Sequence, residues 1–126
     1  MVQADISQLS AECNTWRETL RNYRQEFTDL KKHLQQIASH PLSKDDLTDL
    51  EHYQNQFHIQ LINIHDLKHD IKSHERRVSF ETSSHDGQLE ERTVADHEVL
   101  YEQYIRLENT LQGLREDFTS FTERTR

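Results

Sequence analysis

The sequence predicts an all-α protein, a long antiparallel bundle of three helices of coiled-coil type that run up, down and up. Apolar residues recur at alternating spacings of three and four along most of the chain, which is typical of such helices. Only two glycines and one proline interrupt 126 residues, so few places could turn a sheet. A hydrophobic share of 33% suits thin helices that each bury one stripe. We expect a single domain over residues 1–126.

The first helix is predicted over residues 5–39. Its apolar stripe alternates without exception and carries three large aromatic side chains, which fill the space among several helices better than the groove of a two-stranded coil. The stripe consists of Ile6, Leu9, Cys13, Trp16, Leu20, Tyr23, Phe27, Leu30, Leu34 and Ile37. Asp5 can cap the start, and Pro41 forces the chain out of the helix near Ser39.

The second helix is predicted over residues 44–78. Ser43, with an acidic residue three positions later, forms a variant of the capping box at its start. The apolar stripe drifts toward one flank and leaves Gln54, Lys68 and Glu75 at strict heptad positions. The stripe consists of Leu47, Leu50, Tyr53, Phe57, Leu61, Ile64, Leu67, Ile71 and Val78. We therefore expect a wide buried face that touches both neighbouring helices.

The third helix is predicted over residues 87–124, after a loop. The stretch 79–88 holds polar cap-forming residues and Gly87, and either Ser84 or Asp86 can cap the helix. The stripe consists of Thr93, His97, Leu100, Tyr104, Leu107, Leu111, Leu114, Phe118 and Phe121. Three helices of similar length joined by short loops should pack antiparallel around one core.

The order of charges agrees with these boundaries. Acidic residues gather at the predicted helix starts, and the basic residues Arg76, Arg77 and Arg124 lie at predicted ends, as the helix dipole favours. In outline, a long three-helix coil with a tryptophan in its first helix, here Trp16, resembles a spectrin-type repeat. This resemblance rests on architecture and Trp16, and it implies the fold alone.

Composition narrows the classes of function. The chain has 23 acidic and 15 basic residues without a block of like charge, so nucleic acid is not an expected partner. No apolar run approaches the roughly 20 residues that cross a bilayer, and the first residues lack the order of a secretory signal. We therefore expect a cytoplasmic protein with no membrane partner. Without a glycine-rich loop or nucleophile elbow, we expect no enzyme, cofactor or small-molecule substrate.

Nine histidines are an unusual feature of this composition. His65 and His69 lie one helical turn apart on the second helix, a spacing that can bind zinc. In an antiparallel bundle, Cys13, His69 and His97 could fall in one layer and provide three ligands. The alternative is an inert Cys13 with solvated or structural histidines, in which His97 hydrogen-bonds Asp70 or a backbone carbonyl. A metal-binding bundle that uses His65, His69, His97 and Cys13 is therefore the second hypothesis for function.

The middle of the second helix is apolar on two sides. The stripe faces the core, whereas Ile59 and Ile62 project to the opposite side, with His58 and His65 beside them. An exposed apolar patch usually marks a protein contact, although two isolated surface isoleucines are common. The leading hypothesis is a non-enzymatic interaction or scaffold module that self-associates as a homodimer through these four residues. An adaptor that holds a partner's amphipathic helix is a variant of it.

Overall fold

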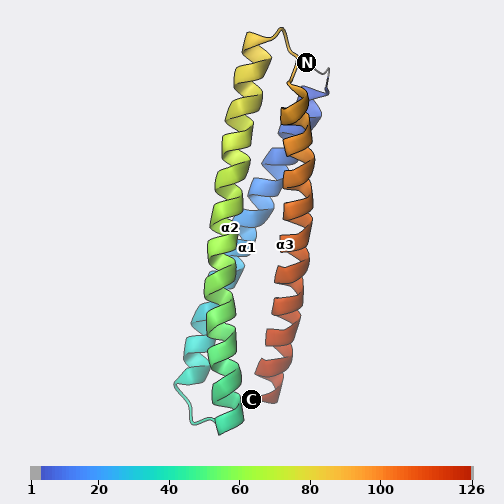
Figure 1. The fold of residues 1–126 in the computed structure, drawn as a ribbon. Helices are drawn as coiled ribbons and strands as arrows, with labels where there is room; N and C mark the ends of the chain where they lie inside the picture. The colour runs from blue at the N-terminus through green and yellow to red at the C-terminus, as the bar shows by residue number, and fades with distance from the viewer. Residues whose placement is uncertain (1–3, 126) are drawn as a thin grey trace.

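Three long helices make up nearly all of the computed structural model, which describes residues 4–125 (Figure 1). They are α1 (Ile6–Ala38), α2 (Lys44–Ser84) and α3 (Glu91–Arg124). In Figure 1, α1 runs down, α2 runs back up and α3 runs down again, so α1 starts and α3 finishes at opposite ends of the bundle. The predicted all-α three-helix bundle is confirmed, and α3 packs back onto its own chain. No helix within residues 4–125 is long and apolar enough to cross a membrane.

The starts of α1 and α2 follow the predicted local signals. The carboxylate of Asp5 accepts a hydrogen bond from the backbone N–H of Gln8 at 3.0 Å. The hydroxyl of Ser43 accepts one from the backbone N–H of Asp46 at 3.1 Å. Each bond satisfies an N–H group that has no partner in the first helical turn. Both predicted caps are therefore confirmed.

The predicted end of the second helix is wrong. Instead of stopping at Val78, α2 continues to Ser84, and its added turn includes a hydrogen bond from the Thr82 hydroxyl to the Val78 carbonyl at 2.7 Å. The polar residues of this stretch predict a loop, but hydroxyl side chains can be satisfied within a helix by such bonds. Arg76 and Arg77 consequently lie outside the last turn of α2, so their predicted position at the helix end is wrong.

The turn between α2 and α3 also differs from the prediction. Asp86 and Gly87 both have left-handed backbone, with φ angles of 51° and 79°. The N–H of Gly87 donates to the carbonyl of Thr82 at 3.0 Å, which closes α2 in the manner of a Schellman motif. Helix α3 then begins at Glu91 rather than at residue 87, and neither Ser84 nor Asp86 caps it. The cap position is Glu90, whose side chain makes no capping bond.

The core-facing seam of α2 is regular, and it includes polar residues that the apolar pattern did not include. Gln60, His74 and Glu81 are buried at positions three or four residues from buried apolar neighbours. The predicted stripe instead included Leu61 and Leu47, and Leu47 is 47% exposed. The observed seam is Leu50, Tyr53, Phe57, Gln60, Ile64, Leu67, Ile71, His74, Val78 and Glu81. Its constant alternation keeps one face of α2 toward the core along the whole helix.

The core changes in character along the bundle. Near the turn between α1 and α2 it is rich in aromatic rings, of which Phe57 and Phe118 meet edge to face with centroids 5.0 Å apart. The aromatic residues are Phe27, Tyr53, Phe57, Phe118 and Phe121. Toward the other end of the bundle the seams carry Cys13, His74, Glu81, Thr93 and His97, all buried. A small apolar cluster of Leu9, Val78 and Leu89 lies beyond Cys13 and His74, farther from the aromatic end of the bundle.

Helix α2 packs closely against both other helices, whereas the backbones of α1 and α3 approach each other at few places. In Figure 1, α1 passes diagonally behind the other two helices. The space between α1 and α3 is filled by Trp16, whose ring centroid lies 4.8 Å from that of His97 and 5.8 Å from that of Tyr104. At the surface, Arg115 of α3 joins Glu26 of α1 at 3.0 Å.

Candidate functional site

Cys13 of α1, His74 of α2 and His97 of α3 meet in the polar section of the core. Each lies on the seam of its helix, and their exposed fractions are 1%, 6% and 2%. The Sγ atom of Cys13 and one ring nitrogen from each histidine all lie within 4.8 Å of one another. Within residues 4–125, no other group of three His, Cys, Asp or Glu side chains brings ligand atoms together in this way. We call these three residues the Cys–His cluster.

The contacts within the Cys–His cluster converge on one atom, Nδ1 of His97. The Nε2 atom of His74 lies 3.0 Å from it, which is a hydrogen bond, and the Sγ atom of Cys13 lies 3.9 Å from it. When His74 donates this bond, a neutral His97 carries its own proton on Nε2. That Nε2 atom has no hydrogen-bond partner, and a carboxylate oxygen of Glu12 lies 3.6 Å from it. The ring of Trp16 stacks on His97 and holds its plane.

Burial sets the protonation of the Cys–His cluster. Burial raises the pKa of the Cys13 thiol to about 12, and the negative charges of Glu75 and Glu12 contribute to the rise. Burial also lowers the pKa of His74, with a further contribution from the neighbouring His97. At neutral pH the cluster therefore contains a thiol and a neutral His74. Because the thiolate is the reactive form of cysteine, Cys13 is unsuited to nucleophilic catalysis.

A surface groove borders the Cys–His cluster at His74. It has a volume of about 280 Å³ and is lined by Asp70, Ser73, His74, Arg77, Asp96 and Leu100. An ion pair between Arg77 and Asp96, at 2.9 Å, forms part of its wall. The groove gives a route from solvent to the edge of His74.

The structure brings together two of the predicted metal ligands, Cys13 and His97, but places His74 rather than His69 beside them. His65 and His69 are exposed and belong to no three-ligand group within the described residues. The predicted alternative, a hydrogen bond from His97 to Asp70, is replaced by the bond to His74. The prediction of a shared layer for residues 13 and 97 thus agrees with the structure, and its partner on α2 was wrong.

The replacement of His69 by His74 follows from the length of α2. Because α2 continues to Ser84, the turn into α3 lies further along the chain than predicted, and the residue of α2 that faces His97 also lies further along. One signal in the sequence could have found it. His74 lies three residues after Ile71 and four before Val78, which is a strict seam position.

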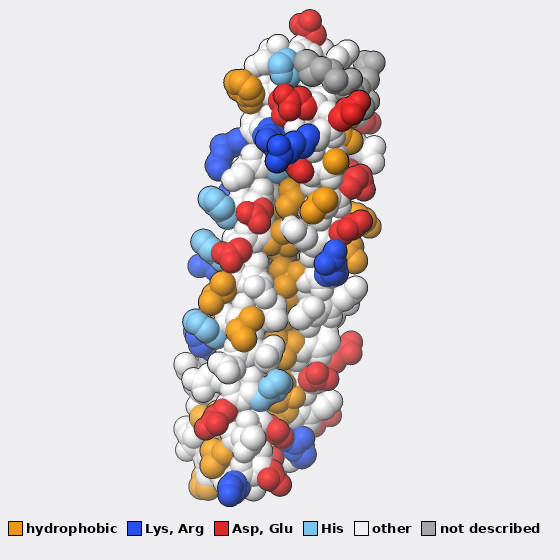
Figure 2. All heavy atoms as spheres, in the orientation of Figure 1, with side chains coloured by type: hydrophobic (Ala, Val, Ile, Leu, Met, Phe, Trp, Pro, Cys, Tyr) orange, Lys and Arg blue, Asp and Glu red, His pale blue; other side chains and the backbone are white. Residues whose placement is uncertain are grey.

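The predicted interface residues all lie on the surface. Ile59 and Ile62 are 42% and 47% exposed, and His58 and His65 are exposed beside them. Figure 2 shows histidines along the α2 side of the bundle, with hydrophobic side chains among them that polar atoms separate from one another. The exposure of these four residues agrees with the prediction, and the contact that they were predicted to make stays a prediction.

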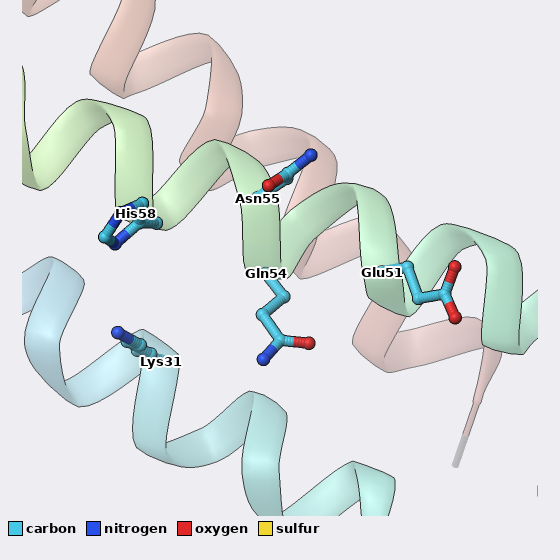
Figure 3. A pocket seen from close by; sticks show the side chains of 5 residues that line it. All are labelled: Lys31, Glu51, Gln54, Asn55 and His58. Carbon is cyan, nitrogen blue, oxygen red and sulfur yellow. The ribbon is translucent and has the colours of Figure 1, made fainter.

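A second groove lies between α1 and α2 (Figure 3). Its volume is about 380 Å³, and it is lined by Lys31, Glu51, Gln54, Asn55 and His58. Gln54 extends from α2 toward α1, between Lys31 on one side of the groove and the rest of the α2 lining on the other, while Asn55 points away from α1. The lining offers no nucleophile with an adjacent base and no pair of carboxylates, so it has no catalytic arrangement.

Similarity to known proteins adds nothing to these assignments. No protein family, curated protein or solved structure matches the chain. The function is therefore inferred from the residues themselves, above all from the outer side of α2 and from the Cys–His cluster.

Proposed function

We propose that the chain is a non-enzymatic scaffold module that pairs with a second copy of itself through the outer face of α2. The outer face consists of Asp45, Thr48, His52, Asn55, Ile59, Ile62, Asp66, His69, Ser73 and Arg76, all of them exposed. These positions repeat the three-four spacing of the core seam on the opposite side of the same helix. The observation that carries the proposal is this regular outer stripe with two exposed isoleucines at its centre.

The outer face is symmetric in spacing and complementary in charge about Ile59 and Ile62. Asp45 precedes Ile59 by as many residues as Arg76 follows Ile62. In an antiparallel pair of α2 helices, Ile59 of one copy meets Ile62 of the other, and Asp45 meets Arg76 at both ends. A two-fold interface requires this kind of self-complementary surface. The occupant that fits the outer face is therefore a second copy of the chain.

The isoleucines supply the affinity of this pairing, and the charges set its register. Covering the remaining exposed half of each isoleucine is worth roughly 1 kcal/mol. An exposed ion pair contributes about 0.2–1 kcal/mol. Because association also costs translational and rotational freedom, we expect a weak dimer that forms at high protein concentration. A cytoplasmic setting is proposed with it, in which the free thiol of Cys13 stays reduced.

Light scattering over a series of protein concentrations tests the pairing. The parent chain should approach the mass of a dimer as concentration rises, and Ile59→Asp/Ile62→Asp should stay monomeric because two carboxylates cannot be buried unpaired. Val99→Asp is the matched control, since Val99 is 51% exposed on α3 and lies outside the outer face. It should dimerise like the parent. A monomeric parent, or a double variant that dimerises unchanged, would contradict the proposal.

Charge reversal tests the antiparallel register. Asp45→Arg and Arg76→Asp should each weaken the dimer, because each places two like charges at both ends of the interface. The two reversals together restore opposite charges and should restore the dimer. If the double reversal stays as weak as the single ones, Asp45 and Arg76 do not face each other across the two-fold axis.

A further inference from the structure

We propose that Cys13, His74 and His97 form a binding site for a divalent transition metal, with Zn²⁺ as the best fit. One sulfur and two imidazole nitrogens, one from each helix, meet in a closed section of the core. A thiolate with two imidazoles is the borderline donor set that Zn²⁺ favours. On binding, the metal replaces the thiol proton of Cys13, which leaves to solvent. The three donors lie in the core, and none of them belongs to the outer face of α2.

The three donor atoms already lie close to the geometry of a zinc site. With Zn–S near 2.3 Å and Zn–N near 2.0–2.1 Å, tetrahedral donors lie about 3.3–3.6 Å apart. In the Cys–His cluster the two ring nitrogens are 3.0 Å apart, and Sγ of Cys13 is 3.9 Å from Nδ1 of His97. No donor pair is further apart than 4.8 Å. Small side-chain rotations therefore bring all three donors to a common ion.

The surroundings of His97 orient it to bind a metal through Nδ1. This atom faces Cys13 and His74, while Nε2 faces Glu12 at 3.6 Å and is buried without a hydrogen-bond partner. Metal-ligating histidines almost always direct their second nitrogen to a carboxylate, a carbonyl or a water. Glu12 is placed to accept the Nε2 proton, which would satisfy the group that is otherwise unpaired. We assign Glu12 as a positioning residue.

The groove at His74 completes the requirements of the site. Of the three ligands only His74 lines this groove, so the groove brings solvent to one edge of the Cys–His cluster, and side-chain movement at His74 would let an ion and a fourth, water ligand enter. The ligands come from α1, α2 and α3, so a bound ion joins all three helices. Binding should therefore stabilise the folded chain.

Without a metal ion, the same residues form a polar core layer. His74 would hydrogen-bond His97, Cys13 would fill space, and the layer would serve only to set the register of the helices. The two roles differ in one measurable property. Only a metal site converts the Cys13 thiol into a metal-bound thiolate.

A Co²⁺ titration of the full chain, with any affinity tag removed, tests the site. We expect a thiolate-to-cobalt charge-transfer band in the near ultraviolet that saturates at one ion per chain and disappears when Zn²⁺ displaces the cobalt. Surface histidines cannot produce this band because they contain no sulfur. Added Zn²⁺ should also raise the melting temperature, because the ion binds the folded state.

Single-residue variants test each ligand. Cys13→Ala should abolish the band, and His74→Gln should weaken cobalt binding roughly tenfold or more. Glu12→Gln should weaken it by about 10–100-fold while it keeps the band, as expected of a positioning residue. His65→Gln/His69→Gln is the matched control, because both residues are exposed on the same helix. It should keep the parent's band and its zinc-dependent rise in melting temperature.

The outcomes that would overturn the site are equally direct. A parent chain without the charge-transfer band, or without a rise in melting temperature on addition of Zn²⁺, would leave the polar layer as the role of these residues. Binding that survives His74→Gln and is lost in the His65→Gln/His69→Gln control would move the site elsewhere. Circular dichroism of each variant shows whether it folds, and should Cys13→Ala not fold, the parent and His74→Gln still decide the outcome.

Discussion

The buried carboxylate of Glu81 connects the end of α2 to the start of α3. It is 3% exposed, and it accepts hydrogen bonds from the Thr93 hydroxyl at 2.6 Å and from the backbone N–H of Glu90 at 2.9 Å. Burial by itself would raise the pKa of Glu81, but these two bonds and the charge of Arg77 lower it below its ordinary value. The side chain therefore stays charged at a helix start, where the dipole favours negative charge.

Replacing this carboxylate should give a stability defect that depends on pH. At neutral pH, Glu81→Gln should lower the free energy of unfolding by about 1–3 kcal/mol, because one bond partner of Glu90 or Thr93 is lost. The pKa of Glu81 is lower in the folded chain, so its contribution is present above the ordinary value of 4.5 and is lost as pH falls through the folded pKa. The difference from the parent should shrink accordingly. Urea unfolding at several pH values measures it.

The exposed Glu91 provides the control for this experiment. It lies in the first turn of α3, and Glu91→Gln removes the same charge without removing a buried hydrogen bond. We expect a change of less than about 0.5 kcal/mol. A defect in Glu81→Gln that stays constant between neutral and acid pH would mean that its charge does not contribute.

His74 illustrates at the same scale why the candidate site was predicted only in part. Cys13 and His97 lie on stripes that apolar neighbours define, so their positions in the core could be read from the sequence. On the second helix, Leu47 and Leu61 fit an apolar stripe that bypasses His74, so apolar residues alone do not select the regular seam that includes it. The choice of His74 over His69 also depends on where α2 ends, and residues 79–84 are helical although their composition predicts a loop.

At the scale of the helices, the boundaries that could be predicted are those set by contacts close in sequence. The boundary that could not be predicted depends on contacts between helices. The starts of α1 and α2 are set by Asp5 and Ser43, whose capping bonds reach only three residues along the chain. The start of α3 is set by Glu81, whose bonds cross the turn to another helix. Local signals of the first kind are visible in a sequence, whereas the second kind exists only once the helices are docked.

The seam of α1 gives a prediction of its own. Leu20 is fully buried against the main core, so Leu20→Ala should lower the free energy of unfolding by about 2–5 kcal/mol. Leu107 of α3 is half-buried, and the same change there should cost less. Gln35→Ala changes an exposed side chain of α1 and should be nearly silent. Denaturant unfolding of the three variants checks this order, and equal costs at Leu20 and Gln35 would contradict the assigned core.

At the scale of the whole molecule, the bundle has an aromatic half and a polar half. Around Phe57 the core is closed by rings from all three helices, whereas around His74 polar side chains, among them His97 and Glu81, occupy core positions beside apolar ones. Apolar burial is the main source of stability. The two halves should therefore differ in how readily they open.

Hydrogen exchange should reveal this difference. Amides of α2 near Phe57 should exchange more slowly than those near His74, because polar side chains take core positions near His74 that apolar side chains fill near Phe57. If the Cys–His cluster binds zinc, added Zn²⁺ should slow exchange near His74 and leave the region near Phe57 almost unchanged. Faster exchange near Phe57 than near His74 in the metal-free chain would contradict the assigned division of the core.

The polar positions on the seam of α2 also determine which alignment of the helices is possible. A hairpin of uniformly apolar heptads can slide by one heptad and still bury its seam, so several alignments compete. Here such a slide would set His74 against Tyr104 or Glu90 instead of His97, and it would separate the Glu81 carboxylate from Thr93. Each misaligned state would bury polar groups without partners. The polar residues make the core less apolar, but they also destabilise the misaligned hairpins that a more hydrophobic sequence would populate.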